Sequence, residues 1–204
     1  MSIGYLAFVL HAHLPFVRHP ESDYVLEEEW LFEAITETYI PLLQSFEGLR
    51  RDGVNFKLTM SLTPPLISML QDPLLQERYD HHLAKLEELA EMEIDRNMHN
   101  GHLKYLAEHH AEEFNRVRHT WEHYGGNLVK AFKQFFDSNN LEIITCGATH
   151  GYLPLMKMYP QAVWAQIKVA CEHYEQTFGV PANGIWLPEC AYYEGLERML
   201  ADAG

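Results

Sequence analysis

Short apolar runs that end in polar or turn residues recur along this chain. These runs are Leu6 to Leu10, Phe56 to Met60, Leu141 to Cys146 and Ile185 to Leu187. They are rich in β-forming residues and bounded by glycine or polar residues, which is typical of buried parallel strands. Residues 27–49 lie between the first two runs and place apolar residues near helical spacing, with acidic residues in the first turn. The pattern predicts a strand, helix, strand unit.

Helical periodicity extends over residues 72–140. Asn100-Gly101 and Gly125-Gly126 interrupt it, which predicts about three helices. This stretch is longer than a single crossover helix requires, so we interpret residues 73–140 as a helical insertion on a βα loop. Further helices are expected over residues 161–178, with Gly179 as the stop signal, and over residues 194–203.

Strands that alternate with helices predict an α/β fold with a parallel sheet, in which functional groups gather at the carboxyl ends of the strands. Each of the four runs is followed by candidate groups at that end. The chain stops after a helix, where another strand is expected. We therefore interpret residues 1–204 as the N-terminal part of a TIM-barrel-like (β/α) barrel that continues beyond residue 204.

Composition narrows the class of partner. The chain has 204 residues, is 47% hydrophobic and carries a formal net charge of −14. This charge repels phosphate backbones and anionic lipids, which argues against nucleic-acid and membrane partners and favours a neutral substrate. The N-terminus lacks the basic region of a secretory signal, and its apolar run is too short for a membrane span, so we expect a cytoplasmic protein. Three cysteines without CxxC spacing argue against a disulfide framework and a structural zinc site.

The first strand-end motif is His11-Ala12-His13. Residues two apart on a strand project to the same face, so both imidazoles point into one pocket if the strand prediction holds. Such a pair can hold a divalent ion, as in hydrolases of the amidohydrolase kind, or donate hydrogen bonds to sugar hydroxyls. The two histidines can also be purely structural, and spacing alone leaves the three interpretations open.

Two later motifs add a histidine and a carboxylate. Gly147-Ala148-Thr149-His150-Gly151 follows the third strand, and its glycines allow a tight turn that brings His150 close to a ligand. Glu189 follows Pro188, which stiffens the approach, and Trp186 offers a flat face that can stack on a sugar ring. Taken alone, His150 suits an exposed turn and Glu189 suits a helix start. Their common position at strand ends favours a shared site.

Other aromatic and histidine residues carry weaker signals. Trp30 lies after the histidine pair and is a second candidate for contact with a sugar. His119 and His123 have a zinc-like spacing, but no His-Glu-x-x-His pattern accompanies them, so we interpret the histidines of the helical segment as solvated helix faces.

Three motifs together resemble glycoside hydrolase family 57. In order they are His11-Ala12-His13-Leu14-Pro15, Gly147-Ala148-Thr149-His150-Gly151-Tyr152 and Trp186-Leu187-Pro188-Glu189-Cys190-Ala191-Tyr192. They resemble the first three of five signature motifs of that family, and the last two are most similar to the versions in its 1,4-α-glucan branching enzymes. Motif order and spacing span nearly the whole chain.

This resemblance implies an incomplete (β/α)7 barrel and a retaining transfer on α-1,4-glucan without a cofactor or a metal. It makes Glu189 the nucleophile and His11, His13, His150, Trp186 and Trp30 contacts to substrate such as amylose or a glycogen-like glucan. The family's acid/base aspartate is expected beyond residue 204, so residues 1–204 alone should be inactive. The resemblance also implies a role in glycogen biosynthesis.

Three rival functions stay open at this stage. Within the family, α-amylase and 4-α-glucanotransferase are the nearest. A metal-dependent hydrolase or deacetylase would use His11, His13 and His150, with Glu189, as metal ligands. A non-catalytic glucan-binding fragment is the third.

Overall fold

A computed structural model describes residues 3–22 and 24–204 of the protein. Met1 and Ser2, which begin the N-terminus that was judged to lack a signal sequence, lie outside the described residues. The chain forms two compact units. One contains Met1–Phe16, Asn55–Met69 and Lys133–Gly204, and the other contains Val17–Val54 and Leu70–Phe132. The first unit carries the sheet and the second is helical.

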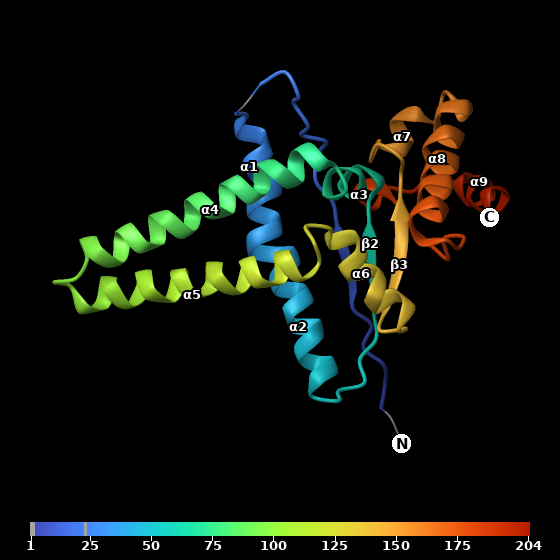
Figure 1. Cartoon of the computed structure of the whole chain (residues 1–204). Coiled ribbons are helices and arrows are strands. Elements are labelled where there is room, and N and C mark those ends of the chain that lie inside the picture. Colours follow the sequence, from blue (N-terminus) through green and yellow to red (C-terminus); the bar gives the residue numbers. More distant parts are fainter. Residues whose placement is uncertain (1–2, 23) are drawn as a thin grey trace. The chain divides into compact units, whose positions relative to one another are not determined.

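The sheet has four parallel strands in the order β1-β2-β3-β4 (Figure 1). Their bounds are Val9–Ala12 for β1, Leu58–Leu62 for β2, Leu141–Cys146 for β3 and Ile185–Trp186 for β4. Every strand therefore ends at the same edge of the sheet, and the predicted parallel α/β fold is confirmed.

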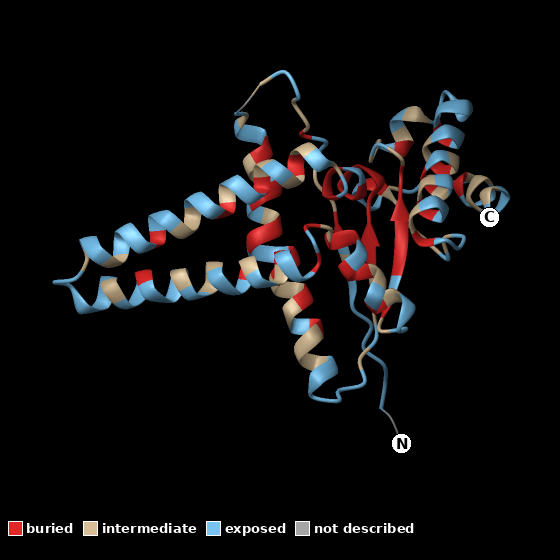
Figure 2. Ribbon diagram, viewed as in Figure 1, coloured by how far each residue is buried: buried red, intermediate tan, exposed pale blue. Residues whose placement is uncertain are grey.

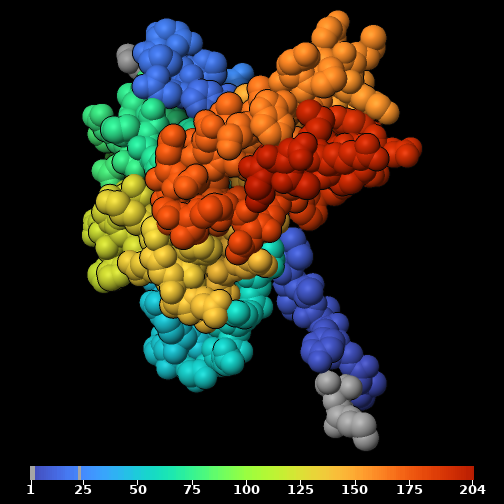
Figure 3. Space-filling view, turned by 90° about the vertical axis from the view of Figure 1, so that its right-hand side faces the viewer, coloured from blue at the N-terminus to red at the C-terminus, as the bar shows by residue number. Residues whose placement is uncertain are grey.

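The first two strands begin later than predicted. Hydrogen bonding between them starts at Phe8, whose carbonyl oxygen accepts from the Thr59 amide, so Leu6 and Ala7 precede the strand. Leu6 is 81% exposed and Phe8 60% exposed, and the prediction that this run is buried was wrong. Pairing with a neighbouring strand, rather than apolar character, decides where a strand begins. In Figure 3 the N-terminal segment (blue) projects from the surface of the sheet unit, to which it belongs.

Helices follow each of the middle strands within the sheet unit. α3 (Pro64–Leu70) and α7 (Leu153–Met156) were not predicted, because each is short and begins at or beside a proline. α8 (Pro160–Phe178) ends at Gly179, which has the positive φ of 81° that the stop signal predicted. α9 (Leu196–Ala203) packs against α7 and α8 through a buried apolar cluster of Leu153, Val163, Ile167 and Leu196.

The helical unit contains one long continuous helix with a π-helical turn in its middle, and a helical hairpin. The continuous helix consists of α1 (Leu26–Ala34), the π-helical turn η1 (Ile35–Tyr39) and α2 (Ile40–Arg51). The hairpin pairs α4 (Pro73–Arg96) with α5 (Gly101–His123), and α6 (Leu128–Asp137) leads from this unit back to the sheet unit. Asn100 caps α5, which begins at Gly101, and Gly125-Gly126 lies between α5 and α6, so the three predicted helices are confirmed, whereas the insertion bounds 73–140 stay a prediction.

Burial in the hairpin is confined to a narrow stripe. Leu75, Tyr79 and Leu83 are buried on α4, and most other positions of the hairpin are exposed (Figure 2). The exposed positions include the hairpin histidines His81, His99, His102, His109, His110, His119 and His123. This agrees with solvated helix faces, but His82 is an exception, because its side chain is only 16% exposed, pairs with Glu29 at 3.1 Å and lies against the Phe32 ring.

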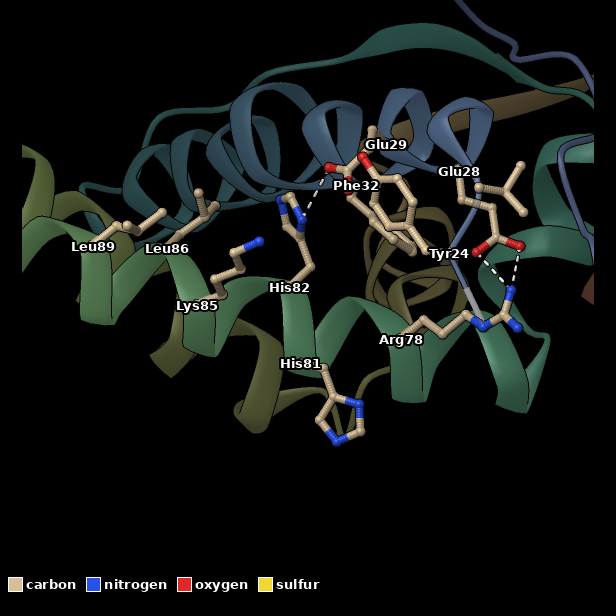
Figure 4. A pocket seen from close by; sticks show the side chains of 11 residues that line it. Tyr24, Glu28, Glu29, Phe32, Arg78, His81, His82, Lys85, Leu86 and Leu89 are labelled. Atoms are coloured by element: carbon tan, nitrogen blue, oxygen red, sulfur yellow. Dashed lines mark hydrogen bonds and ion pairs between the residues drawn. The ribbon is translucent and has the colours of Figure 1, made fainter. Parts of the chain in front are cut away.

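A hollow of about 340 Å³ opens between α1 and α4 of the helical unit (Figure 4). At one end Arg78 Nη1 donates to both carboxylate oxygens of Glu28, at 2.6 and 2.8 Å, and to the backbone carbonyl of His19. Arg78 Nη2 donates to the backbone carbonyl of Ser22. Glu28 is only 2% exposed. This ion pair attaches the segment before α1 to helix α4.

Among residues 3–22 and 24–204, no helix combines the length and apolar character needed to span a bilayer.

Replacing Arg78 with alanine should lower the free energy of unfolding by about 3–5 kcal/mol, because Glu28 is left as a buried carboxylate without its partner. Urea unfolding followed by circular dichroism measures the change. The matched control is Arg96→Ala, which removes an exposed pair with Glu93 and should stay within about 0.5 kcal/mol of wild type. Equal destabilisation by the two variants would contradict this account.

Candidate active site

Parallel pairing fixes the orientation of the two motif histidines. His11 lies opposite Ser61 across β1 and β2, and its Nδ1 hydrogen-bonds the Ser61 hydroxyl at 2.5 Å. His13 Nδ1 hydrogen-bonds the Thr63 hydroxyl at 3.1 Å. Both hydroxyl residues are completely buried, so they serve as fixed supports. The two rings are 6.1 Å apart and nearly parallel, as the same-face prediction requires.

His150 enters the same site from the end of β3. Its ring stacks on His13, with centroids 3.6 Å apart and planes 8° apart. Its Nε2 lies 3.1 Å from Nε2 of His11. A hydrogen bond between two imidazole nitrogens requires one to carry a proton and the other to lack it, so at least one of these rings is neutral.

Trp186 and Glu189 complete the group from β4 and the turn that follows it. The Trp186 ring stacks on His11, with centroids 5.0 Å apart. Glu189 Oε1 lies 4.0 Å from Nδ1 of His150, and its side chain is 71% exposed. The five side chains thus come from three strand ends, and the carboxylate faces solvent, where a substrate can reach it.

Backbone strain is concentrated at this site. His150, Glu189 and Cys190 all have φ of 55°, in the left-handed region that residues with a Cβ rarely adopt. Among the described residues, Asn139 is the one other non-glycine residue with positive φ. Such conformations cost of order 1–3 kcal/mol each and persist where surrounding structure imposes them, often at functional sites.

Gln166 of α8 holds the turn that presents His150, a role that no sequence pattern indicated. Its Oε1 accepts from the Thr149 amide at 3.0 Å, its Nε2 donates to the Thr149 hydroxyl at 2.7 Å, and its carbonyl accepts from the Ala148 amide. Gly147 is required beside it, because an added Cβ would lie 3.1 Å from Pro188 and 3.2 Å from Gln166. An amide on a helix facing a turn has no sequence signature.

Burial keeps the imidazoles neutral. Burial, together with the smaller effects of the neighbouring His150 and His11, lowers the pKa of His13 to about 4. Burial likewise lowers the pKa of His11 and of His150, while Glu189 acts in the opposite direction on both. Neutral imidazoles can both donate and accept hydrogen bonds, which suits contact with hydroxyl groups.

A cleft of about 490 Å³ opens beside His13 and His150. Its other walls come from the chain after β1, from α3 and from α8, and they include Pro15, Phe16 and Pro64. Phe16 is 58% exposed. The cleft therefore combines an apolar wall with the polar rim of the site.

The metal-hydrolase hypothesis predicted that His11, His13, His150 and Glu189 bind one ion. The structure brings a different set of possible metal ligands together. In the described part of the chain, the one group of this kind is His11, Cys146 and His150. His13 and Glu189 do not belong to it. Trp30 belongs to the helical unit, and its contact with substrate stays a prediction.

A parallel α/β sheet with polar groups at its carboxyl edge is the arrangement of barrel enzymes. A sequence model described as "Glycosyl hydrolase family 57" matches residues 7–204, and the chain belongs to this family.

Relatives and solved structures agree on the family. The chain is 38% identical to a 1,4-alpha-glucan branching enzyme of Thermococcus kodakarensis, over 93% of this chain and 27% of that protein. It resembles the crystal structure of the alpha-amylase AmyC from Thermotoga maritima with a TM-score of 0.93 and 47% identity, covering 97% of this chain and 38% of that one. For a branching enzyme from Pyrococcus horikoshii the TM-score is 0.87 and the identity 38%, over 93% and 35% of the two chains. The chain thus spans between about a quarter and two fifths of the length of these proteins.

Replacing Gln166 with leucine should lower the free energy of unfolding by about 1–3 kcal/mol, because two side-chain hydrogen bonds to Thr149 are lost. Denaturant unfolding measures this change. The matched control is Gln176→Leu, an exposed position on the same helix, which should be near neutral. A Gln166→Leu protein as stable as the control would show that the turn holds its shape unaided.

His13 should make stability fall on acidification. Its pKa is about 4 in the folded chain and 6.5 as a free side chain, so between these values the unfolded state binds more protons. Stability is therefore expected to decrease as pH falls from about 6.5 to about 4, with no further loss from this group below that range. NMR titration of the His13 ring, with unfolding measured across the same range, tests this. The exposed His119→Gln should keep the slope and His13→Gln should reduce it, and a His13 ring that titrates near 6.5 would contradict the assignment.

Proposed function

We propose that the protein containing this chain is a 1,4-alpha-glucan branching enzyme that works by a retaining double displacement. The observation that carries the proposal is the convergence of an exposed carboxylate, three imidazoles and a tryptophan at one edge of the parallel sheet. Membership of glycoside hydrolase family 57 and similarity to proteins named as branching enzymes support it.

Glu189 is the nucleophile of this proposal. One of its carboxylate oxygens attacks the anomeric carbon of an α-1,4-linked glucose, forming a glycosyl-enzyme ester while the glycosidic bond breaks. The departing 4-oxygen needs a proton, and the aspartate that donates it is expected outside residues 1–204. The 6-hydroxyl of a second glucan chain then attacks the same carbon, gives its proton back to that aspartate and releases Glu189. The product is an α-1,6 branch.

The imidazoles and Trp186 position the sugar. Burial lowers the pKa of His11, His13 and His150 and so favours their neutral forms, which can hydrogen-bond glucose hydroxyls. Ser61 supports His11 and Thr63 supports His13, each through Nδ1, while Nε2 of His11 lies against Nε2 of His150. Trp186 contributes an apolar face against the ring of a glucose unit. Trp30 is proposed as a further stacking contact.

Alpha-amylase is the second candidate, because the Thermotoga maritima structure of 47% identity carries that name. The two activities share Glu189 and the covalent step and differ in the acceptor, which is water for hydrolysis and a glucan hydroxyl for transfer. 4-α-Glucanotransferase differs again by using a 4-hydroxyl. The apolar-walled cleft beside His13 supports transfer over hydrolysis. A second glucan chain bound in this cleft would displace the water that hydrolysis needs.

The proposed substrates are neutral α-glucans such as amylose or a glycogen-like polymer. The formal net charge of −14 is compatible with neutral glucans, whereas it repels phosphate-rich partners. No cofactor enters this chemistry, and nucleic acid and membrane are not proposed as partners. We place the protein in the cytoplasm, in glycogen biosynthesis.

Glu189→Gln in the intact protein should abolish formation of α-1,6 linkages and of new reducing ends while amylose binding is retained, because the amide keeps the shape of the side chain but cannot form the ester. Proton NMR counts the α-1,6 linkages, a reducing-end assay measures hydrolysis, and affinity electrophoresis measures binding. The matched control is Glu194→Gln, a nearby exposed glutamate that should keep full activity.

Three outcomes separate the candidates. New α-1,6 linkages in wild type support branching, whereas reducing ends without new linkages indicate amylase activity. Linkage formation that survives Glu189→Gln would refute the assigned nucleophile.

A further inference from the structure

Cys146 is the chemically distinct residue beneath the histidine group, and the proposed reaction does not use it. It is the last residue of β3, is completely buried and pairs with Trp186 of β4. Burial raises the pKa of its thiol to about 12, so the sulfur is a neutral thiol at neutral pH. One ligand atom each from His11, Cys146 and His150 lies within 4.8 Å of the others.

This spacing is close to that of a metal centre. Two nitrogens bound to one tetrahedral Zn²⁺ at about 2.0–2.1 Å lie about 3.3 Å apart, and Zn–S bonds of about 2.3 Å place a sulfur slightly further out. The Nε2 atoms of His11 and His150 are already 3.1 Å apart. The ligand atoms of all three residues lie within 4.8 Å of one another, which is somewhat wider than a tetrahedral Zn²⁺ site requires.

The donor set selects the kind of ion. Two imidazole nitrogens and one sulfur favour Zn²⁺ and similar transition metals, whereas Mg²⁺ and Ca²⁺ prefer oxygen ligands. His11 is an exposed residue whereas Cys146 is buried, so an ion would enter from the side of His11.

We propose that His11, Cys146 and His150 bind Zn²⁺ and that the bound ion blocks the sugar site. The blocking part rests on the proposed function, because it requires that His11 and His150 contact glucan. When Zn²⁺ binds, the Cys146 thiol loses its proton to solvent, the hydrogen bond between His11 and His150 breaks, and water fills the fourth position. The ion is an inhibitor of the proposed reaction and takes no part in it.

The binding test uses Co²⁺ and Zn²⁺ on the intact protein. Co²⁺ should give a thiolate-to-cobalt charge-transfer band in the near ultraviolet, and Zn²⁺ should displace it at one ion per chain. Cys146→Ala should abolish the band and weaken Zn²⁺ binding by more than the roughly 10–100-fold that loss of an outer-shell partner costs. Cys190→Ala, which removes an exposed thiol near the same site, should keep both.

The inhibition test measures amylose binding with and without Zn²⁺, so it does not depend on catalysis. Zn²⁺ should weaken amylose binding in wild type and in Cys190→Ala, and should have little effect in Cys146→Ala. Cys146→Ser replaces the alanine variant if the latter does not fold, which circular dichroism shows.

Each result has a defined reading. A missing charge-transfer band, or equal Zn²⁺ affinity in wild type and Cys146→Ala, would overturn the site. Bound Zn²⁺ without any loss of amylose binding would overturn the blocking step. A protein that binds no amylose even without metal would refute the proposed function instead, and the cobalt band would then still decide the metal site.

Discussion

Parallel pairing of the four strands is the constraint on which the rest of this structure depends. Because all strands run in one direction, their carboxyl ends meet at one edge, and residues separated by up to about 180 positions in sequence become neighbours there. The pairing also sets the details, since His11 lies opposite Ser61 and Cys146 opposite Trp186. A slip of one residue in β1 would turn both motif histidines to the other face of the sheet.

Local devices refine what the sheet brings together. Buried hydroxyls hold two imidazoles, Gln166 holds the turn before the third, and left-handed backbone at His150 and Glu189 aims those side chains into the group. The strain of these conformations has to be offset by surrounding structure. The apolar cluster that joins α7, α8 and α9 supplies rigid packing next to the His150 turn. Stability elsewhere thus supports an unfavourable local geometry that the proposed chemistry needs.

The helical unit has its own basis of stability. Its hairpin buries only a narrow apolar stripe, and a buried ion pair between Glu28 and Arg78 adds a specific contact between α1 and α4. Charged pairs of this kind orient elements more than they stabilise them, because desolvation of two ions cancels much of their attraction. The exposed hairpin histidines lie outside this apolar stripe. The histidines that matter for the proposed reaction all come from the sheet unit.

The sequence by itself determined the fold class, β3 and α8 with its stop at Gly179, because apolar periodicity and turn residues act over short distances. It also indicated the family, through three motifs. Only the tertiary structure decided the start of β1, which depends on its partner β2, and the short helices α3 and α7. It alone revealed the Gln166 contacts, the left-handed backbone at His150 and Glu189, and the place of Cys146 beneath the imidazoles. These features depend on contacts between residues distant along the chain, and such contacts leave no periodic signal in it.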